Sequence, residues 1–334
     1  MTFDEQVRAL EPLRLTPRQA RFVATVALHS GYCLRRQYMA FAGLRYGKVV
    51  RGFLETLVAR GLATKERCRA DRGFLYHLHA RSIYRALRQD DNRNRRRASL
   101  AAIGRKLMIL DFVITKPEVE WYATEEDKVE LFTTRFGVPS ADFPQQTFTA
   151  YEDRTSPTTR YFMHKLPVFL AGQPPVVHFV ALAMDPTAAD FERFLHDHAR
   201  LVARLREWTV VVVTPTGASN AEACRRMFER TVGVPVGPVP NRADLIHYFT
   251  TRRAVERNEL AALSVADLNR FRDARQRFIQ PAIETLYAQW LVGGDRVVGD
   301  STAAGGWSPM STGRFVARQL PFKYEQFGDF AGVC

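Results

Sequence analysis

Two clusters of basic side chains lie close together in the first third of the chain. The first comprises Arg45, Lys48 and Arg51, with Tyr46 as a further candidate contact residue between them, and the second comprises Lys65, Arg67, Arg69 and Arg72. Lys and Arg side chains that gather at two neighbouring points of a fold are typical of a surface that neutralises the phosphates of a polyanion. The alternative is that both clusters only keep two exposed faces solvated.

A run of arginines follows the two clusters. Its members are Arg93, Arg95, Arg96 and Arg97. One interpretation is a basic arm along DNA, where each neutralised phosphate adds salt-dependent affinity. The other is a flexible linker, over residues 89–106, that its charge keeps soluble. The sequence leaves both open.

The net charge of the chain is divided unevenly. Residues 1–106 hold 23 Lys and Arg against 8 Asp and Glu, a net of +15, whereas the remaining 228 residues have a net of −2. The basic excess therefore belongs to the N-terminal third alone. Such an asymmetry is expected when one domain meets a polyanion and another does not.

The elements that must position the two clusters follow from local signals. Helices are expected over 15–31, where Thr16 is the N-cap and Pro17 the first helical residue, over 33–43, and over 45–61. Two strand-like runs follow, 62–69 and 73–79, joined by a turn. Three helices and then a hairpin is the order of a winged helix, a variant of the helix-turn-helix.

In a winged helix, the first cluster lies at the start of the third helix and the second at the hairpin tip. The third helix enters the major groove and reads base edges with its N-terminal residues. The hairpin tip reaches phosphates or the adjacent minor groove. Helical segments with a hairpin also serve as protein-interaction modules, so a protein or RNA partner for this domain is the alternative.

Three stretches of this region, 15–31, 47–66 and 74–87, carry a resemblance to a known family. They read LTPRQARFVATVALHSG, GKVVRGFLETLVARGLATKE and FLYHLHARSIYRAL. Residues 14–110 resemble the winged-helix N-terminus of replication-relaxation type proteins of plasmids and integrative elements. The resemblance implies a winged-helix fold, binding to double-stranded DNA and a role on a mobile element.

The expected fold class is α+β, in five segments. They are a winged helix over 1–88, the basic linker over 89–106, a mixed α/β domain over 107–240, a helical segment over 241–292 and an irregular tail over 293–334. In the α/β domain, a strand, a helix, a fully apolar strand and a second helix follow one another, which predicts a crossover connection in a small parallel or mixed sheet.

The strand–helix–strand order at 160–214 also resembles the core of PD-(D/E)XK nucleases, which hold magnesium with acids on adjacent strands. The residues do not follow that chemistry. Lys165 and His164 have no acid in their strand, and Asp185 stands at the end of the next one without a lysine after it. Glu152 and Asp153 lie upstream in a turn. A degenerate core without catalytic residues, metal or cofactor is therefore expected, and a metal-dependent nuclease remains the less favoured alternative.

The sequence as a whole predicts a cytoplasmic, non-enzymatic protein that binds double-stranded DNA sequence-specifically. Its four cysteines are scattered without a CxxC pair, and no apolar stretch approaches the length of a membrane span. The expected role is transcriptional regulation on a plasmid or other mobile element, with a homodimer or a protein partner bound through the C-terminal domain. A replication or conjugation factor that binds an origin is the alternative with identical DNA chemistry.

Overall fold

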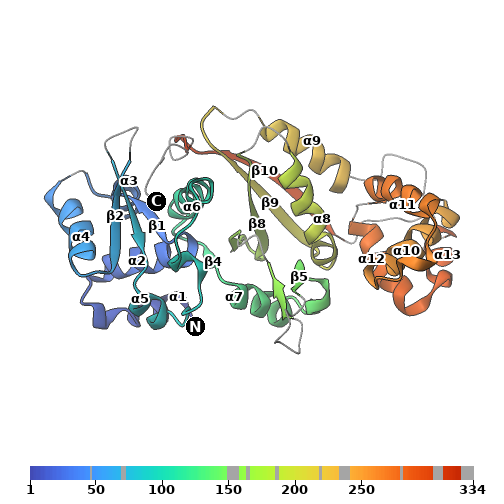
Figure 1. The fold of residues 1–334 in the computed structure, drawn as a ribbon, viewed down its shortest axis with the longest axis horizontal. Coiled ribbons are helices and arrows are strands. Elements are labelled where there is room, and N and C mark those ends of the chain that lie inside the picture. The colour runs from blue at the N-terminus through green and yellow to red at the C-terminus, as the bar shows by residue number, and fades with distance from the viewer. Residues whose placement is uncertain are drawn as a thin grey trace. The chain divides into compact units, whose positions relative to one another are not determined.

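The computed structural model describes residues 1–45, 47–68, 73–148, 158–162, 166–184, 188–217, 220–232, 241–278, 281–303 and 311–324. The fold is mixed α+β with several sheets (Figure 1). The chain divides into two compact units. Unit 1 comprises Met1–Thr124, Val213–Ala218 and Arg318–Cys334, and unit 2 comprises Glu125–Val212 and Ser219–Ala317.

The N-terminal part of unit 1 alternates helices with short strands. Its elements are α1 (Phe3–Arg8), η1 (Glu11–Leu13), α2 (Pro17–His29), β1 (Tyr32–Leu34), α3 (Arg35–Ala42), α4 (Lys48–Ala59), β2 (Ala63–Arg67), β3 (Phe74–Leu78), α5 (Arg81–Ala86), η2 (Arg93–Arg95), α6 (Leu100–Ile114) and β4 (Glu120–Tyr122).

The helices of this part begin where their capping signals predict. The Thr16 hydroxyl accepts a hydrogen bond from the Gln19 N–H, and the Gln19 side chain accepts one from the Thr16 N–H in return, which closes a capping box at the start of α2. The buried residues of α4 are Val50, Phe53, Leu54 and Leu57, at the spacing of one helical face. The core therefore lies on one side of α4, and the other side faces solvent.

A three-stranded antiparallel sheet, in the order β1-β3-β2, completes this part of unit 1. His77 on the central strand pairs with Tyr32 and Thr64, and Tyr76 pairs with Cys33 and Lys65. Successive side chains of a strand point to opposite faces. One face, with Cys33 and Tyr76, joins the core that α2, α3 and α4 supply. The face with Tyr32 and His77 is the opposite one.

Residues 89–106, expected as a linker, carry η2 and the first turns of α6 instead. The Asn94 side chain is only 5% exposed. The segment therefore packs against the rest of unit 1, because the Asn94 side chain hydrogen-bonds to the end of α2.

Two late segments of the chain complete unit 1. The Asp111 carboxylate, 6% exposed on α6, accepts two hydrogen bonds from the Arg36 guanidinium, at 2.5 and 2.8 Å, and one from the Tyr324 hydroxyl at 2.6 Å. The Leu320 N–H donates to the Thr214 carbonyl at 2.8 Å. Residues 213–217 and 318–324 are thereby held within unit 1.

Unit 2 contains the larger sheet and most of the later helices. Its elements are α7 (Glu125–Glu130), a π-helical turn η3 (Leu131–Arg135), η4 (Ser140–Asp142), β5 (Gln145–Phe148), β6 (Thr158–Tyr161), β7 (Val168–Ala171), β8 (Val176–Leu182), α8 (Ala189–Ala203), β9 (Glu207–Thr214), α9 (Ala221–Val232), α10 (Arg242–Glu256), η5 (Leu260–Ala262), α11 (Val265–Phe278), α12 (Pro281–Gly293), α13 (Asp295–Ala303) and β10 (Thr312–Gln319), with the last residues of β9 and β10 in unit 1.

Within unit 2 the strands of this sheet follow the order β10-β9-β8-β7, and the sheet is mixed, as the sequence predicts. Strands β7 and β8 are antiparallel. Thr312 donates to the Arg206 carbonyl and Leu320 to that of Thr214, so β10 runs in the same direction as β9. Strands β8 and β9 are neighbours joined through α8, which is the expected crossover unit (Figure 1).

Residues 293–334, expected as an irregular tail, contribute α13 and the strand β10. Gly313 permits the pairing of β10, because a Cβ there would lie 2.7 Å from both the Trp208 and the Val232 side chains. The Trp208 indole donates to the Ser311 hydroxyl at 3.1 Å, and that hydroxyl donates to the Val202 carbonyl at 2.7 Å. A residue without a side chain thus lets an aromatic ring pack against the strand.

The late helices α10 to α13 form a separate apolar core in unit 2. Tyr248, Phe249, Tyr287 and Trp290 are among its buried residues. One ion pair lies inside it, with the Arg252 Nη1 2.7 Å from the Glu284 Oε1. Within the described ranges, none of the helices combines the length and the apolar character that crossing a bilayer requires.

Candidate nucleic-acid interface

The start of α4 presents basic side chains on an exposed face. Arg45, Lys48 and Arg51 are all exposed, and none has an acidic partner in the part of the chain that the structure describes. The N-cap residue is Gly47, which supplies no side-chain cap, whereas Ser99 caps α6. The N–H groups of the first turn of α4 therefore add their partial positive charge to the same end.

Arg67 on β2 lies level with Arg51 on α4. The Lys65 ammonium is 2.6 Å from the Glu55 carboxylate, and this ion pair holds β2 beside α4. The strand and the helix run in opposite directions (Figure 1). Arg67 lies two residues beyond Lys65, about 7 Å along the strand. Arg51 lies four residues before Glu55, about 6 Å back along the helix. Ideal helix and strand spacing therefore places Arg51 and Arg67 toward the same end of the α4–β2 pair.

Lys65, expected from the sequence to contact DNA, is instead engaged within the fold. Its ammonium group pairs with Glu55 and lies 4.0 Å from the centre of the Phe74 ring. The Tyr76 hydroxyl also donates to the Glu55 carboxylate, at 3.4 Å. Lys65 therefore holds β2 against α4 within the fold, and its charge is compensated before any ligand binds.

The arginine run lies on the opposite face of the small sheet from α4. The Arg97 guanidinium is 2.7 Å from the Glu66 carboxylate, and the Ala98 N–H donates to the Tyr32 hydroxyl at 2.9 Å. Glu66 and Tyr32 share the face of the sheet that α4 does not cover. The basic residues predicted from the sequence thus form two surfaces, which we call the helix surface (Arg45, Lys48, Arg51 and Arg67) and the arginine run (Arg93, Arg95, Arg96 and Arg97).

Within the arginine run, Arg93, Arg96 and Arg97 are exposed and Arg95 is half-buried. Arg97 is paired with Glu66 but its side chain remains 78% exposed, and this pair raises the pKa of the guanidinium. Arg93 and Arg96 have no acidic partner among the described residues. The run therefore keeps free positive charge at its surface while part of it is bound to the fold.

Asn94 attaches the arginine run to unit 1. Its amide nitrogen donates to the Ala27 and Leu28 carbonyls at 3.0 Å each, at the C-terminal end of α2. Its amide oxygen accepts from the Lys106 ammonium, and its backbone carbonyl is 3.1 Å from the His77 Nε2. This role could not be predicted, because an asparagine between arginines has the sequence pattern of an exposed polar residue.

His77 makes the stability of unit 1 depend on pH. Burial is the main cause that lowers the pKa of this imidazole from its ordinary 6.5. The folded state then binds the proton less tightly than the unfolded chain, so protonation favours unfolding and stability declines as pH falls below about 6.5. Because the His77 ring donates to the Asn94 carbonyl, glutamine is the matched replacement.

We expect the melting temperature to fall between about pH 7.5 and about pH 5.5, and to fall less in His77→Gln. Calorimetry of the full chain at both pH values measures this. Equal declines in the two proteins would contradict the role given to His77.

Several residues named from the sequence lie outside the described residues. On the DNA-binding side they are Tyr46, Arg69 and Arg72, and on the side of the nuclease alternative they are Glu152, Asp153, His164, Lys165 and Asp185. Among the residues that are described, no group of three or more His, Cys, Asp or Glu side chains is placed to hold a metal ion.

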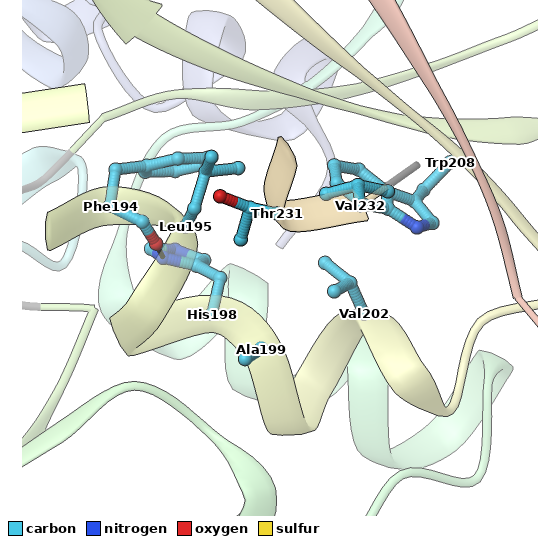
Figure 2. A pocket seen from close by; sticks show the side chains of 8 residues that line it. All are labelled: Phe194, Leu195, His198, Ala199, Val202, Trp208, Thr231 and Val232. Carbon is cyan, nitrogen blue, oxygen red and sulfur yellow. Dashed lines mark hydrogen bonds between the residues drawn. The ribbon is translucent and has the colours of Figure 1, made fainter. Parts of the chain in front are cut away.

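A small pocket in unit 2 has no chemistry that suggests a ligand. Figure 2 shows it between α8, the end of α9 and the Trp208 ring. Its cavity volume is about 10 Å³, room for about one water molecule. The buried His198 on its wall is 2.9 Å, through its Nδ1, from the Phe194 carbonyl of its own helix. The pocket is a packing defect of the α8–α9 layer.

Comparison of the chain with protein-family models, curated proteins and solved structures found no match.

Proposed function

We propose that the N-terminal part of unit 1 is a winged helix that binds double-stranded DNA. The observation that carries the proposal is the exposed start of α4, where three cations have no acidic partner among the described residues. The order α2, β1, α3, α4, β2, β3 with the antiparallel sheet β1-β3-β2 supports the winged-helix assignment. In this assignment α4 is the recognition helix, and β2 and β3 carry the wing.

In the proposed complex the N-terminal half of α4 enters the major groove. Arg45 and Lys48 position the helix on the groove and its phosphates, and Arg51 is placed to donate to base edges. Arg67, at the end of β2, contacts the phosphates of the adjacent backbone. Lys65 has no part in the contact, since it is paired with Glu55.

The arginine run supplies a second electrostatic contact in the same proposal. It lies on the face of the sheet away from α4, and its exposed members Arg93 and Arg96 are free to neutralise phosphates. Because these contacts do not depend on base sequence, the run contributes affinity and salt dependence without contributing specificity.

The biological role belongs to the proposal as well. The resemblance to replication-relaxation type proteins favours a regulator encoded on a plasmid or other mobile element, and an origin-binding replication or conjugation factor is the second candidate. Both would bind a defined duplex, and the position of that duplex, at a promoter or at an origin, separates them.

The proposal is tested with the full chain and a library of random duplexes. Repeated selection is expected to enrich one sequence, to which binding weakens steeply with salt. Single-stranded DNA and RNA of the same sequence are expected to bind more weakly. Equal affinity for the three nucleic acids, or the absence of any enriched sequence, would contradict sequence-specific duplex recognition.

A homodimer formed through the C-terminal domain is part of the same proposal. A two-fold dimer places two recognition helices on the same side of the duplex one helical turn apart, or a multiple of it, so the enriched sequence should contain two inverted half-sites. A solution mass of twice 38.1 kDa would agree with this. A monomer that selects a single half-site would disprove it.

A further inference from the structure

Gly52 occupies the middle of the exposed face of α4, and the fold gives no reason for a glycine there. A Cβ added to Gly52 would meet nothing within 4 Å, and its backbone is helical rather than left-handed. Glycine in an exposed helix interior is less favourable than alanine. The missing side chain therefore costs stability and serves no contact within unit 1.

The side chains around Gly52 differ on its two sides. Lys48 and Arg51 lie on one side, together with Glu55, whose carboxylate is paired with Lys65. On the other side, the apolar side chain of Val49 is 62% exposed. The Thr56 hydroxyl donates to the Gly52 carbonyl at 2.7 Å, so this hydroxyl is turned onto the helix backbone. Val49, Gly52 and Thr56 thus form a strip of short side chains along α4, which we call the strip, next to the side of the helix that carries Lys48 and Arg51.

We propose that this strip is the part of α4 that lies against the floor of the major groove, and that Val49 reads the C5-methyl group of a thymine. The inference rests on the proposed DNA binding and deepens it. An α-helix with its side chains nearly fills a major groove about 12 Å wide, so the depth of insertion depends on the side chain at the centre of the face. Gly52 removes that side chain.

Val49 then meets the groove floor with methyl groups. The thymine methyl is the one apolar group that the major groove displays, and apolar side chains contact it. Gly52 acts as a positioning residue and Val49 as a specificity-determining residue. The substrate feature assigned to them is an A·T pair at one position of the site.

The first test is a volume series at position 52. Gly52→Ala and Gly52→Leu should keep or raise the melting temperature, because both residues favour a helix over glycine. Their affinity for the selected duplex should fall, by about tenfold for alanine and further for leucine. Ala101→Leu introduces the same side chain at an exposed position of α6 and should leave binding unchanged. A variant that is more stable than the wild type cannot have lost binding by misfolding.

The second test uses the selected duplex with each thymine replaced in turn by deoxyuridine, which lacks only the methyl group. The wild-type protein should lose about threefold to tenfold in affinity at one position, and Val49→Ala should bind the two duplexes equally. A uniform response of the wild type to all replacements would overturn the assignment of Val49.

The outcomes separate this inference from the proposal on which it rests. If no duplex is selected at all, the proposed function fails. If a duplex is selected but Gly52→Leu binds it as tightly as the wild type, DNA binding stands and the strip is not at the groove floor.

Discussion

Replacing Arg45, Lys48 and Arg51 together with alanine is expected to weaken binding to the selected duplex by about 10²- to 10³-fold at moderate salt. The three side chains are exposed and unpaired in the described structure, so they meet a ligand without first giving up an internal partner. The slope of log affinity against log salt should become shallower by up to about 2, since Arg45 and Lys48 are the two phosphate contacts and each contributes about 0.9. Titration of labelled duplex at several salt concentrations gives both quantities.

A control that removes equal charge from the other end of α4 makes this result specific. Arg8, Arg14 and Arg18 are exposed, and the Arg60 guanidinium, just past the C-terminal end of α4, donates to the Leu13 carbonyl beside them. The variant in which Arg8, Arg14 and Arg18 are replaced by alanine has the same net charge as the Arg45, Lys48 and Arg51 variant. It should lose less than about tenfold, by long-range electrostatics alone. Equal losses in the two variants would mean that net charge, and not the helix surface, determines affinity.

Asn94→Ala is expected to destabilise unit 1 by about 3 kcal/mol, because it leaves two carbonyls at the end of α2 without their donor in a buried place. The Lys106 ammonium loses an acceptor at the same time. Urea unfolding of the full chain measures the free-energy change. The arginine run, released from the sheet, should also lose its fixed position and weaken duplex binding by a few fold.

Asn92→Ala is the matched control for this variant. Asn92 accepts one hydrogen bond from the Asn94 N–H through its side chain and is only half-buried, so its loss should cost about 1 kcal/mol or less. If Asn94→Ala were no more destabilising than Asn92→Ala, the segment 89–106 would behave as the linker that the sequence suggests.

The parts of the fold that local signals encode could be predicted from the sequence. Thr16 with Pro17 begins α2, an apolar face at helical spacing defines α4, and the two runs that flank residues 69–72 form the strands β2 and β3. The mixed sheet of unit 2 also follows from the strand and helix order. In each of these cases neighbouring residues determine the structure.

The parts that could not be predicted depend on partners distant in sequence. Lys65 and Arg67 look equivalent in the sequence, and only the position of Glu55 beside β2 pairs one of them. The three-residue strand β1 is too short to leave a pattern, although it decides which face of the sheet the arginine run meets. The strand β10 forms because Gly313 makes room for Trp208, more than a hundred residues earlier in the chain.

The closing contacts of the chain also set when each unit can finish folding during synthesis. The Asp111 carboxylate cannot accept its hydrogen bond from the Tyr324 hydroxyl, and β9 cannot pair with β10, until these later residues have been synthesised. At a translation rate of about 5 to 20 residues per second, about 200 residues and therefore about 10 to 40 s separate the end of the N-terminal part of unit 1 at Thr124 from Tyr324. For that interval the Asp111 carboxylate of α6 lacks its Tyr324 partner, and from the synthesis of residue 214 onward β9 has a free edge. Because an unpaired strand edge can pair with other chains, we expect the nascent protein to be most prone to aggregation until β10 has been made.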